Sequence, residues 1–402
     1  MKNLFSQKNI FRGAGSVVVA GAIVFMWSIN NETAPIYIAD EHGGNAEVSM
    51  VAVATILPPP PRHISTPEAV RAVYMTSWVA GTPSIREKLV EFIKTSEINA
   101  VVIDVKDYSG KVSFQTGNPV VEKMGSQEAR VPDMRSLIDE LHEADIYTIA
   151  RISVFQDPYV AAKMPEIAVH TKEGAVWKDR KGITWVDPAS PEMWDYIIQV
   201  ARASEAAGFD ELNFDYVRFP SDGNMTNMAF PAWDGVRSRS DVLEEFFSYL
   251  DTELADLPVP ISLDLFGMTM TNTDDLNIGQ VLEKAATHAD YIAPMVYPSH
   301  YPNGWHGFSN PAANPYEVVH YAMSEGERRL QAMRVLAAST TSPSYGTHIA
   351  KLRPWIQDFD LGAEYTADMI QKQKQATYDA GLDSWMAWDP KNVYTKEAYQ
   401  NE

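Results

Sequence analysis

The feature that most constrains the fold is a repeated alternation of short apolar runs and amphipathic helical stretches, which begins at Val70. Continuous apolar runs are typical of strands that are buried on both faces of a parallel sheet. The predicted strands are 70–76, 100–105, 146–154, 211–217, 260–266, 291–297, 334–339 and 384–388, and the predicted helices are 83–96, 132–144, 190–208, 240–255, 278–288, 316–330 and 366–381.

This alternation predicts parallel β/α units. Eight units within about 330 residues fit a (β/α)8 TIM barrel with insertions. The rival is an open doubly wound sheet, but the phosphate-binding glycine turn of such folds is missing after the first run. We therefore expect one α/β domain, a (β/α)8 barrel, over residues 68–402.

The first 67 residues do not follow this pattern. Lys2, Lys8 and Arg12 precede an uncharged, mostly apolar run at 13–29, which is the form of an export signal. No clean cleavage site follows, so we expect a signal peptide or, in preference, an uncleaved membrane anchor at residues 1–30 rather than a buried core helix. Residues 31–67 contain four consecutive prolines and are predicted to be a stalk. The barrel would then lie outside the cytoplasm, secreted or held in the cell envelope.

Charge and cysteine content restrict the chemistry of the chain. It has 33 Lys and Arg against 53 Asp and Glu, a net charge of −20, and no cysteine. The acidic excess argues against nucleic-acid binding and disfavours polyanionic partners, while neutral or cationic glycans stay open. The absence of cysteine excludes thiolate nucleophiles and cysteine metal sites. Carboxylates, histidines and aromatic rings remain as the candidate groups for catalysis and binding.

Motifs of cofactor and metal enzymes are also missing. The nine histidines form no HExxH pair, and neither a phosphate loop nor a G-x-S-x-G elbow is present. Asp274 and Asp275 lack the spacing of a calcium loop. We expect no cofactor and no metal, and no oligomeric state is predicted.

Carboxylates follow several predicted strands, and catalytic groups of such barrels collect at those ends. Asp215 is the strongest candidate, since strand alternation places Asn213 and Asp215 on one face and Phe214 and Tyr216 on the other. As a nucleophile it would stay ionised through nearby donors. The alternative is a purely structural salt bridge with an arginine, Arg151 or Arg218.

Asp264 is the best partner for Asp215. A pKa raised by burial or by the charge of Asp215 would let it donate a proton. The alternative for Asp264 is a capping or supporting role, and Asp358 and Asp389 compete with it as the acid.

Paired carboxyl groups and aromatic rings are what a glycan-cleaving cleft needs. Asp104, Lys106 and Asp107 fit hydroxyl recognition and an internal ion-pair network equally well. Tryptophans at 78, 177, 185, 305, 355 and 388 fit sugar platforms or packing. The predicted substrate contacts are Asp104, Lys106, Arg151, Asn213, Arg218, Tyr297, His300, Trp355, Asp358 and Trp388.

Five segments, at 100–107, 146–151, 213–222, 291–301 and 353–358, resemble a bacterial family of predicted glycoside hydrolases of unknown function. This TIM-barrel group is distantly similar to the α-amylase and α-galactosidase superfamilies, and the resemblance covers roughly 68–395. It implies a (β/α)8 barrel with a carbohydrate-active site. It also implies a nucleophile after the fourth strand, at Asp215, and an acid after the fifth, at Asp264, where amylases have Glu.

The sequence thus predicts a glycoside hydrolase that cleaves an extracellular or cell-envelope polysaccharide through Asp215 and Asp264. A retaining mechanism is favoured. The alternative is a barrel without catalytic activity that binds glycans or serves as a cell-envelope scaffold.

Overall fold

A computed structural model of the chain describes residues 60–339 and 348–400. The predicted signal or anchor at 1–30 and all but the last residues of the predicted stalk lie outside the described residues. Within the described ranges, no helix is both long enough and apolar enough to cross a membrane.

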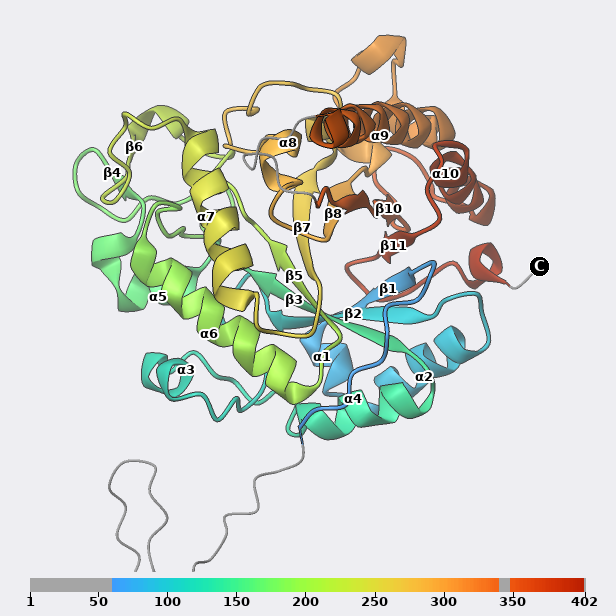
Figure 1. The fold of residues 1–402 in the computed structure, drawn as a ribbon, viewed down its shortest axis with the longest axis horizontal. Coiled ribbons are helices and arrows are strands. Elements are labelled where there is room, and N and C mark those ends of the chain that lie inside the picture. Colours follow the sequence, from blue (N-terminus) through green and yellow to red (C-terminus); the bar gives the residue numbers. More distant parts are fainter. Residues whose placement is uncertain (1–59, 340–347, 401–402) are drawn as a thin grey trace, which may run out of the picture. The chain divides into compact units, whose positions relative to one another are not determined.

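The strands form one parallel sheet that closes on itself (Figure 1). Its order is β10-β11-β1-β2-β3-β5-β7-β8-β9, and β8 also pairs with β10, which completes the barrel. β9 and β10 follow one another along β8, so they fill one position in the wall and the barrel has the predicted (β/α)8 form. The barrel strands are β1 Arg71–Met75, β2 Ala100–Lys106, β3 Tyr147–Ser153, β5 Glu211–Asp215, β7 Ile261–Phe266, β8 Tyr291–Met295, β9 Lys351–Leu352, β10 Trp355–Gln357 and β11 Trp385–Trp388.

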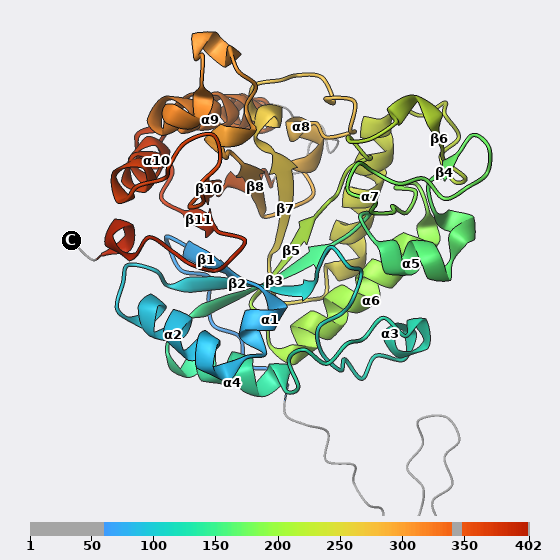
Figure 2. The same ribbon diagram turned by 180° about the vertical axis from the view of Figure 1, so that it is seen from behind.

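The longer helices surround the strands, as the front and back views show (Figures 1 and 2). Prolines at the first helical position and side-chain caps such as Ser190 and Asp157 start several of them. The helices are α1 Ser77–Ala80, α2 Pro83–Lys94, α3 Pro119–Met124, α4 Met134–Glu143, α5 Pro158–Lys163, α6 Pro191–Ala207, α7 Arg239–Leu254, α8 Leu282–Ala285, α9 Pro315–Ser339 and α10 Ala367–Asp379.

The predicted seventh strand at 334–339 is wrong, because these residues form the end of α9. Alanine and leucine are good helix formers, and they extend the helix beyond its predicted end. The wall position belongs instead to β9 and β10, which lie outside the predicted strands. Pro354 lies between them, and a residue without an N–H interrupts a strand pattern. The predicted helix at 278–288 shortens to α8.

Alternate side chains of each strand point into the barrel and change character along it. Tyr74, Val102 and Ile149 belong to an apolar cluster that fills the interior. Two residues further along β2 and β3, the same faces carry Asp104 and Arg151, which are buried and bonded to each other. The barrel interior therefore has an apolar layer and, above it, a charged layer at the carboxyl ends of the strands, where TIM barrels carry their sites.

An insertion after β3 rises beside this end of the barrel. It contains β4 His170–Thr171, which forms a two-stranded antiparallel sheet with β6 Met228–Ala229 from the segment after β5. Antiparallel bridges from His170 to Val176 and from Lys178 to Thr184 make a hairpin within it. Lys181 lies at the tip of that hairpin, where Asp179 caps the turn.

Candidate active site

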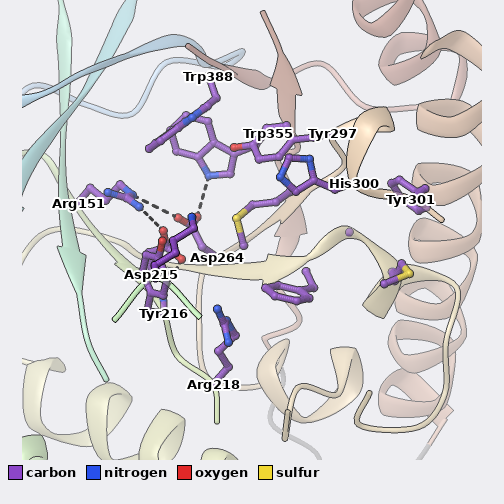
Figure 3. Close-up of a pocket in the computed structure, with 15 residues that line it drawn as sticks. Arg151, Asp215, Tyr216, Arg218, Asp264, Tyr297, His300, Tyr301, Trp355 and Trp388 are labelled. Atoms are coloured by element: carbon purple, nitrogen blue, oxygen red, sulfur yellow. Dashed lines mark hydrogen bonds and ion pairs between the residues drawn. The ribbon is translucent and has the colours of Figure 1, made fainter. Parts of the chain in front are cut away.

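A cavity of about 410 Å³ opens at the carboxyl ends of the strands (Figure 3). Both predicted catalytic aspartates line it, together with aromatic, basic and thioether side chains from the strand ends and from the inserted hairpin. Its lining is Arg151, Lys181, Asp215, Tyr216, Arg218, Asp264, Phe266, Gly267, Met268, Met295, Tyr297, His300, Tyr301, Trp355 and Trp388.

Asp215 is the last residue of β5 and is held from two sides. One carboxylate oxygen forms an ion pair with Nη2 of Arg151, and the other accepts the backbone N–H of Tyr216 at 2.5 Å. Tyr216 has φ of +54°, a left-handed conformation that is uncommon outside glycine. This turn ends the strand alternation, so Tyr216 lines the cavity rather than facing away from it as the sequence predicted.

Asp264 lies deeper, on β7, with 1% of its surface exposed. Its Oδ1 accepts hydrogen bonds from Nδ2 of Asn213 at 2.9 Å and from Nε1 of Trp355 at 2.8 Å. Burial and the negative charge of Asp215 raise the pKa of Asp264 well above its usual range, against the opposing effect of Arg151. Two neighbouring carboxyl groups are thus in different environments, Asp215 paired with a cation and Asp264 buried with a raised pKa.

Arg151 links the charged layer. Its Nη1 donates to Asp104 at 2.6 Å, its Nη2 pairs with Asp215, and its Nε lies 3.9 Å from Asp264. Burial disfavours its positive charge, but Asp215 and Asp104 outweigh burial and raise the pKa of Arg151. Because one small guanidinium group reaches both aspartates of the pair, these lie within the about 10 Å that separates the two acids of glycosidases.

The structure brings most of the predicted site residues together. Besides the two aspartates, the predicted contacts that line the cavity are Arg151, Arg218, Tyr297, His300, Trp355 and Trp388. Trp388 stacks on Tyr74 at 3.9 Å between ring centroids and lies 4.9 Å from the Arg151 guanidinium carbon.

Four predicted substrate contacts do not line the cavity. Lys106 is fully buried, and its ammonium pairs with Asp157 at 2.8 Å, so it has no reach to a substrate. Asp104 and Asn213 bond to Arg151 and Asp264 respectively and support them from below. The fourth is Asp358, whose hydrogen bonds go to the C-terminal segment.

Asp358 joins β10 to the C-terminal segment. It accepts hydrogen bonds from Thr395 and Tyr399, and burial raises its pKa to about 6. Asp389 is the other alternative to Asp264 as the catalytic acid. Its Oδ1 accepts a hydrogen bond from the backbone N–H of Lys391, and it also lies outside the cavity lining.

The tryptophans predicted as sugar platforms divide into three groups. Trp355 and Trp388 line the cavity. Trp177 and Trp185 are 1% and 2% exposed and pack in the core of the insertion, so they are not platforms. Trp305 packs against Tyr301 away from the lining, while Trp78 is exposed and does not line the cavity.

Several lining residues were missed in the sequence. Lys181 comes from the inserted hairpin, and nothing in the strand pattern points to it. Phe266 and Met295 end β7 and β8 and face inward by strand parity, so alternation could have found them. A side chain at Gly267 would meet the Met295 carbonyl oxygen at 2.5 Å, which explains its size. Among the described residues, no three histidine or carboxylate side chains group as metal ligands.

Comparison with known structures supports the fold. The glycoside hydrolase domain of PgaB (BpsB) from Bordetella bronchiseptica is 13% identical, with a TM-score of 0.57 over 83% of this chain and 99% of that one. The α-galactosidase TtGalA from Thermus thermophilus is 13% identical, with a TM-score of 0.50 over 84% of this chain and 61% of that one.

A hypothetical protein from Ruminiclostridium thermocellum is 30% identical, with a TM-score of 0.44 over 51% of this chain and 98% of that one. No curated protein matches the chain. A family model described as "Putative glycosyl hydrolase domain" matches residues 72–394, which include every residue of the cavity lining. The chain therefore belongs to this glycosyl hydrolase-like family, as the resemblance in its sequence implied.

Proposed function

We propose that the protein is a glycosidase that cleaves its substrate by a retaining mechanism, with Asp215 as nucleophile and Asp264 as acid and base. The observation that carries this proposal is the contrast between the two carboxyl groups around Arg151. Asp215 is paired with the guanidinium, whereas burial and the charge of Asp215 raise the pKa of Asp264. Two acids with divergent environments are the pattern from which acid and base roles are assigned.

In the first step, the Asp215 carboxylate attacks the anomeric carbon while Asp264 gives its proton to the departing glycosidic oxygen. The bond to the leaving group breaks, and a glycosyl ester forms on Asp215. In the second step, the Asp264 carboxylate takes a proton from water, whose oxygen displaces Asp215 from the anomeric carbon. The cavity contributes aromatic faces at Trp355 and Trp388 for the sugar rings.

The second acid also argues against a barrel that only binds glycans. A binding cleft needs no partner for Asp215, and a buried carboxyl group without a function is costly. We further propose that the substrate is a polysaccharide outside the cytoplasm, in the cell envelope or beyond it. This part rests on the export-like pattern of charges and apolar residues at 1–30.

A panel of oligosaccharides tests the proposal. Asp215→Asn and Asp264→Asn should each lower kcat/KM at least about 10³-fold without loss of folding, since each removes a reacting group. Asp389→Asn is the matched control, because it changes a strand-end aspartate outside the cavity, and it should stay within a few-fold of wild type. Full cleavage by Asp215→Asn would refute the assignment.

Two further measurements separate a nucleophile from a general base at position 215. Proton NMR of the first product should show the same anomeric configuration as the substrate. Azide should restore turnover to Asp215→Ala and give a glycosyl azide of opposite configuration, because the small anion enters where the carboxylate was. An inverted first product with wild-type protein would show that Asp215 acts on water instead.

A further inference from the structure

Arg218 is a buried cation for which the fold supplies no counter-ion. It is 9% exposed, lines the cavity and, within the part of the chain that the structure describes, has no carboxylate within 4.0 Å. Every other charged group of the layer around Asp215 has such a partner. Burial lowers the pKa of Arg218, which shows that its surroundings oppose the charge.

The Arg218 side chain is held so that one edge stays available. Its Nη1 donates to the carbonyl oxygen of Phe219 at 3.1 Å and to Oγ of Ser221 at 3.0 Å. Its guanidinium carbon lies 4.7 Å from the ring centroid of Trp185 and 4.8 Å from that of Phe266. Among the described residues, Nε and Nη2 have no hydrogen-bond partner, and together they form the fork that matches a carboxylate.

Besides Asp215, which pairs with Arg151, two nearby carboxylates have charges that reach Arg218, and both are engaged elsewhere. Asp222 pairs with Arg180 at 3.1 Å. Asp179 accepts the N–H groups of the hairpin turn and of Trp185. Neither completes an ion pair with Arg218, so the fold leaves its free edge to whatever enters the cavity.

A second cation faces the same cavity. Lys181, exposed at the hairpin tip, has no carboxylate within 4.0 Å in the described ranges. Desolvation and the charge of Lys181 both lower the pKa of His300, which favours its neutral form. Arg151 is shared by Asp215 and Asp104, and burial raises the pKa of Asp264. Arg218 and Lys181, by contrast, face the cavity without a paired carboxylate among the described residues and so present positive charge there.

We propose that Arg218, assisted by Lys181, binds a carboxylate of the substrate, so that the enzyme acts on an acidic glycan with uronic-acid-type sugars. Cleavage of an acidic glycan rests on the proposed function, whereas binding of its carboxylate by Arg218 does not. It revises the expectation from the net charge of −20, which disfavours polyanionic partners. The charges that face the cavity decide whether acidic or neutral glycans are preferred. Arg218 and Lys181 line the cavity, whereas the excess carboxylates of the chain do not.

Binding to Asp215→Asn protein tests the proposal without turnover. The probes are uronic-acid-containing oligosaccharides and the same oligosaccharides after reduction of their carboxyl groups to CH2OH, compared by calorimetry. The acidic form should bind at least about tenfold more tightly for some member of the panel, as expected for a charge-assisted hydrogen bond. Arg218→Met, which keeps an apolar chain between Trp185 and Phe266, should remove the difference and change binding of the reduced form less than about threefold.

Two more variants guard against a merely structural effect. Lys181→Met changes an exposed residue and should reduce the preference about threefold while the melting temperature stays the same. Arg218→Lys keeps the charge without the fork and should restore the preference only in part. Equal or better binding of the reduced glycans, or a preference that survives both methionine variants, would overturn the inference.

The outcomes also separate this inference from the proposed function. Selective binding of acidic glycans without cleavage by wild type would support the carboxylate site and refute the glycosidase. Cleavage of neutral glycans by wild type, with acidic oligosaccharides bound no more tightly than their reduced forms, would support the glycosidase and refute the carboxylate site.

Discussion

At the scale of single residues, the chemistry depends on the proton of Asp264. Nε1 of Trp355 donates to its carboxylate, and this hydrogen bond lowers the pKa of Asp264 against the larger raising effects of burial and Asp215. The acid is active only when protonated, so kcat/KM should fall as the pH rises through the raised pKa of Asp264.

Trp355→Phe is therefore expected to move the alkaline limb of the profile to higher pH, by about one unit for a hydrogen bond to a charged group. The measurement is kcat/KM against pH with a chromogenic glycoside. Trp388→Phe is the control, because Trp388 lines the same cavity without a hydrogen bond to Asp264, and its limb should not move. A shift to lower pH in Trp355→Phe would contradict the role assigned to this bond.

Strand parity was sufficient to predict Asp215, Asp264 and Arg151, because inward positions two residues apart can be read from the alternation. Parity failed for Lys106 and Tyr216. The strand register shifts between Asp104 and Lys106, and Lys106 pairs with Asp157, a partner distant in the chain. Tyr216 leaves the strand through a left-handed turn. The alternation within a single sequence shows neither the partner nor the turn.

At the scale of elements, strands were predictable where apolar runs were unbroken. β1, β3, β5, β7, β8 and β11 lie within predicted runs, and β2 extends one residue beyond its run. β9 and β10 were missed because Pro354 breaks their run. Besides its pairing with β8 and β11, this broken position is tied to β5 by an ion pair, in which Nη1 of Arg353 contacts both carboxylate oxygens of Glu211 at 2.8 Å.

Both partners of this pair are 1% exposed or less. Glu211→Leu or Arg353→Met alone leaves a buried charge unpaired and should lower the free energy of unfolding by about 3–5 kcal/mol. The double variant should recover most of that loss, since no charge is then left in the barrel floor. Urea unfolding of the four proteins measures the coupling, and strictly additive losses would contradict the pairing.

At the scale of the whole molecule, a strongly acidic chain surrounds a cavity whose uncompensated charges are positive. The general repulsion of an acidic glycan acts over distances that salt screens, about 8 Å at physiological ionic strength, while buried contacts are screened much less. Added salt should therefore speed the association of an acidic glycan with the protein more than it weakens the binding of the glycan at Arg218.

For an acidic oligosaccharide substrate, kcat/KM is expected to rise about two- to fivefold between 10 mM and 150 mM salt, with kcat unchanged, because screening removes only the long-range repulsion. A neutral glycan of the same length is the control and should show no such rise. The measurement is a stopped assay of kcat/KM at four salt concentrations. A steady fall of kcat/KM with salt for the acidic substrate would contradict the view that long-range repulsion outweighs the screening of the Arg218 contact.

The split strand has one more consequence, for how the protein responds to heat. β10 meets β8 through a single residue pair, Trp355 with Met295, whereas β2 and β3 share six. Local opening of a barrel starts where the fewest wall contacts must break. Trp355 also holds Asp264. Local opening of the barrel wall between β10 and β8 would first break the hydrogen bond from Trp355 to the proton donor, Asp264. Activity should therefore be lost on warming before the barrel unfolds.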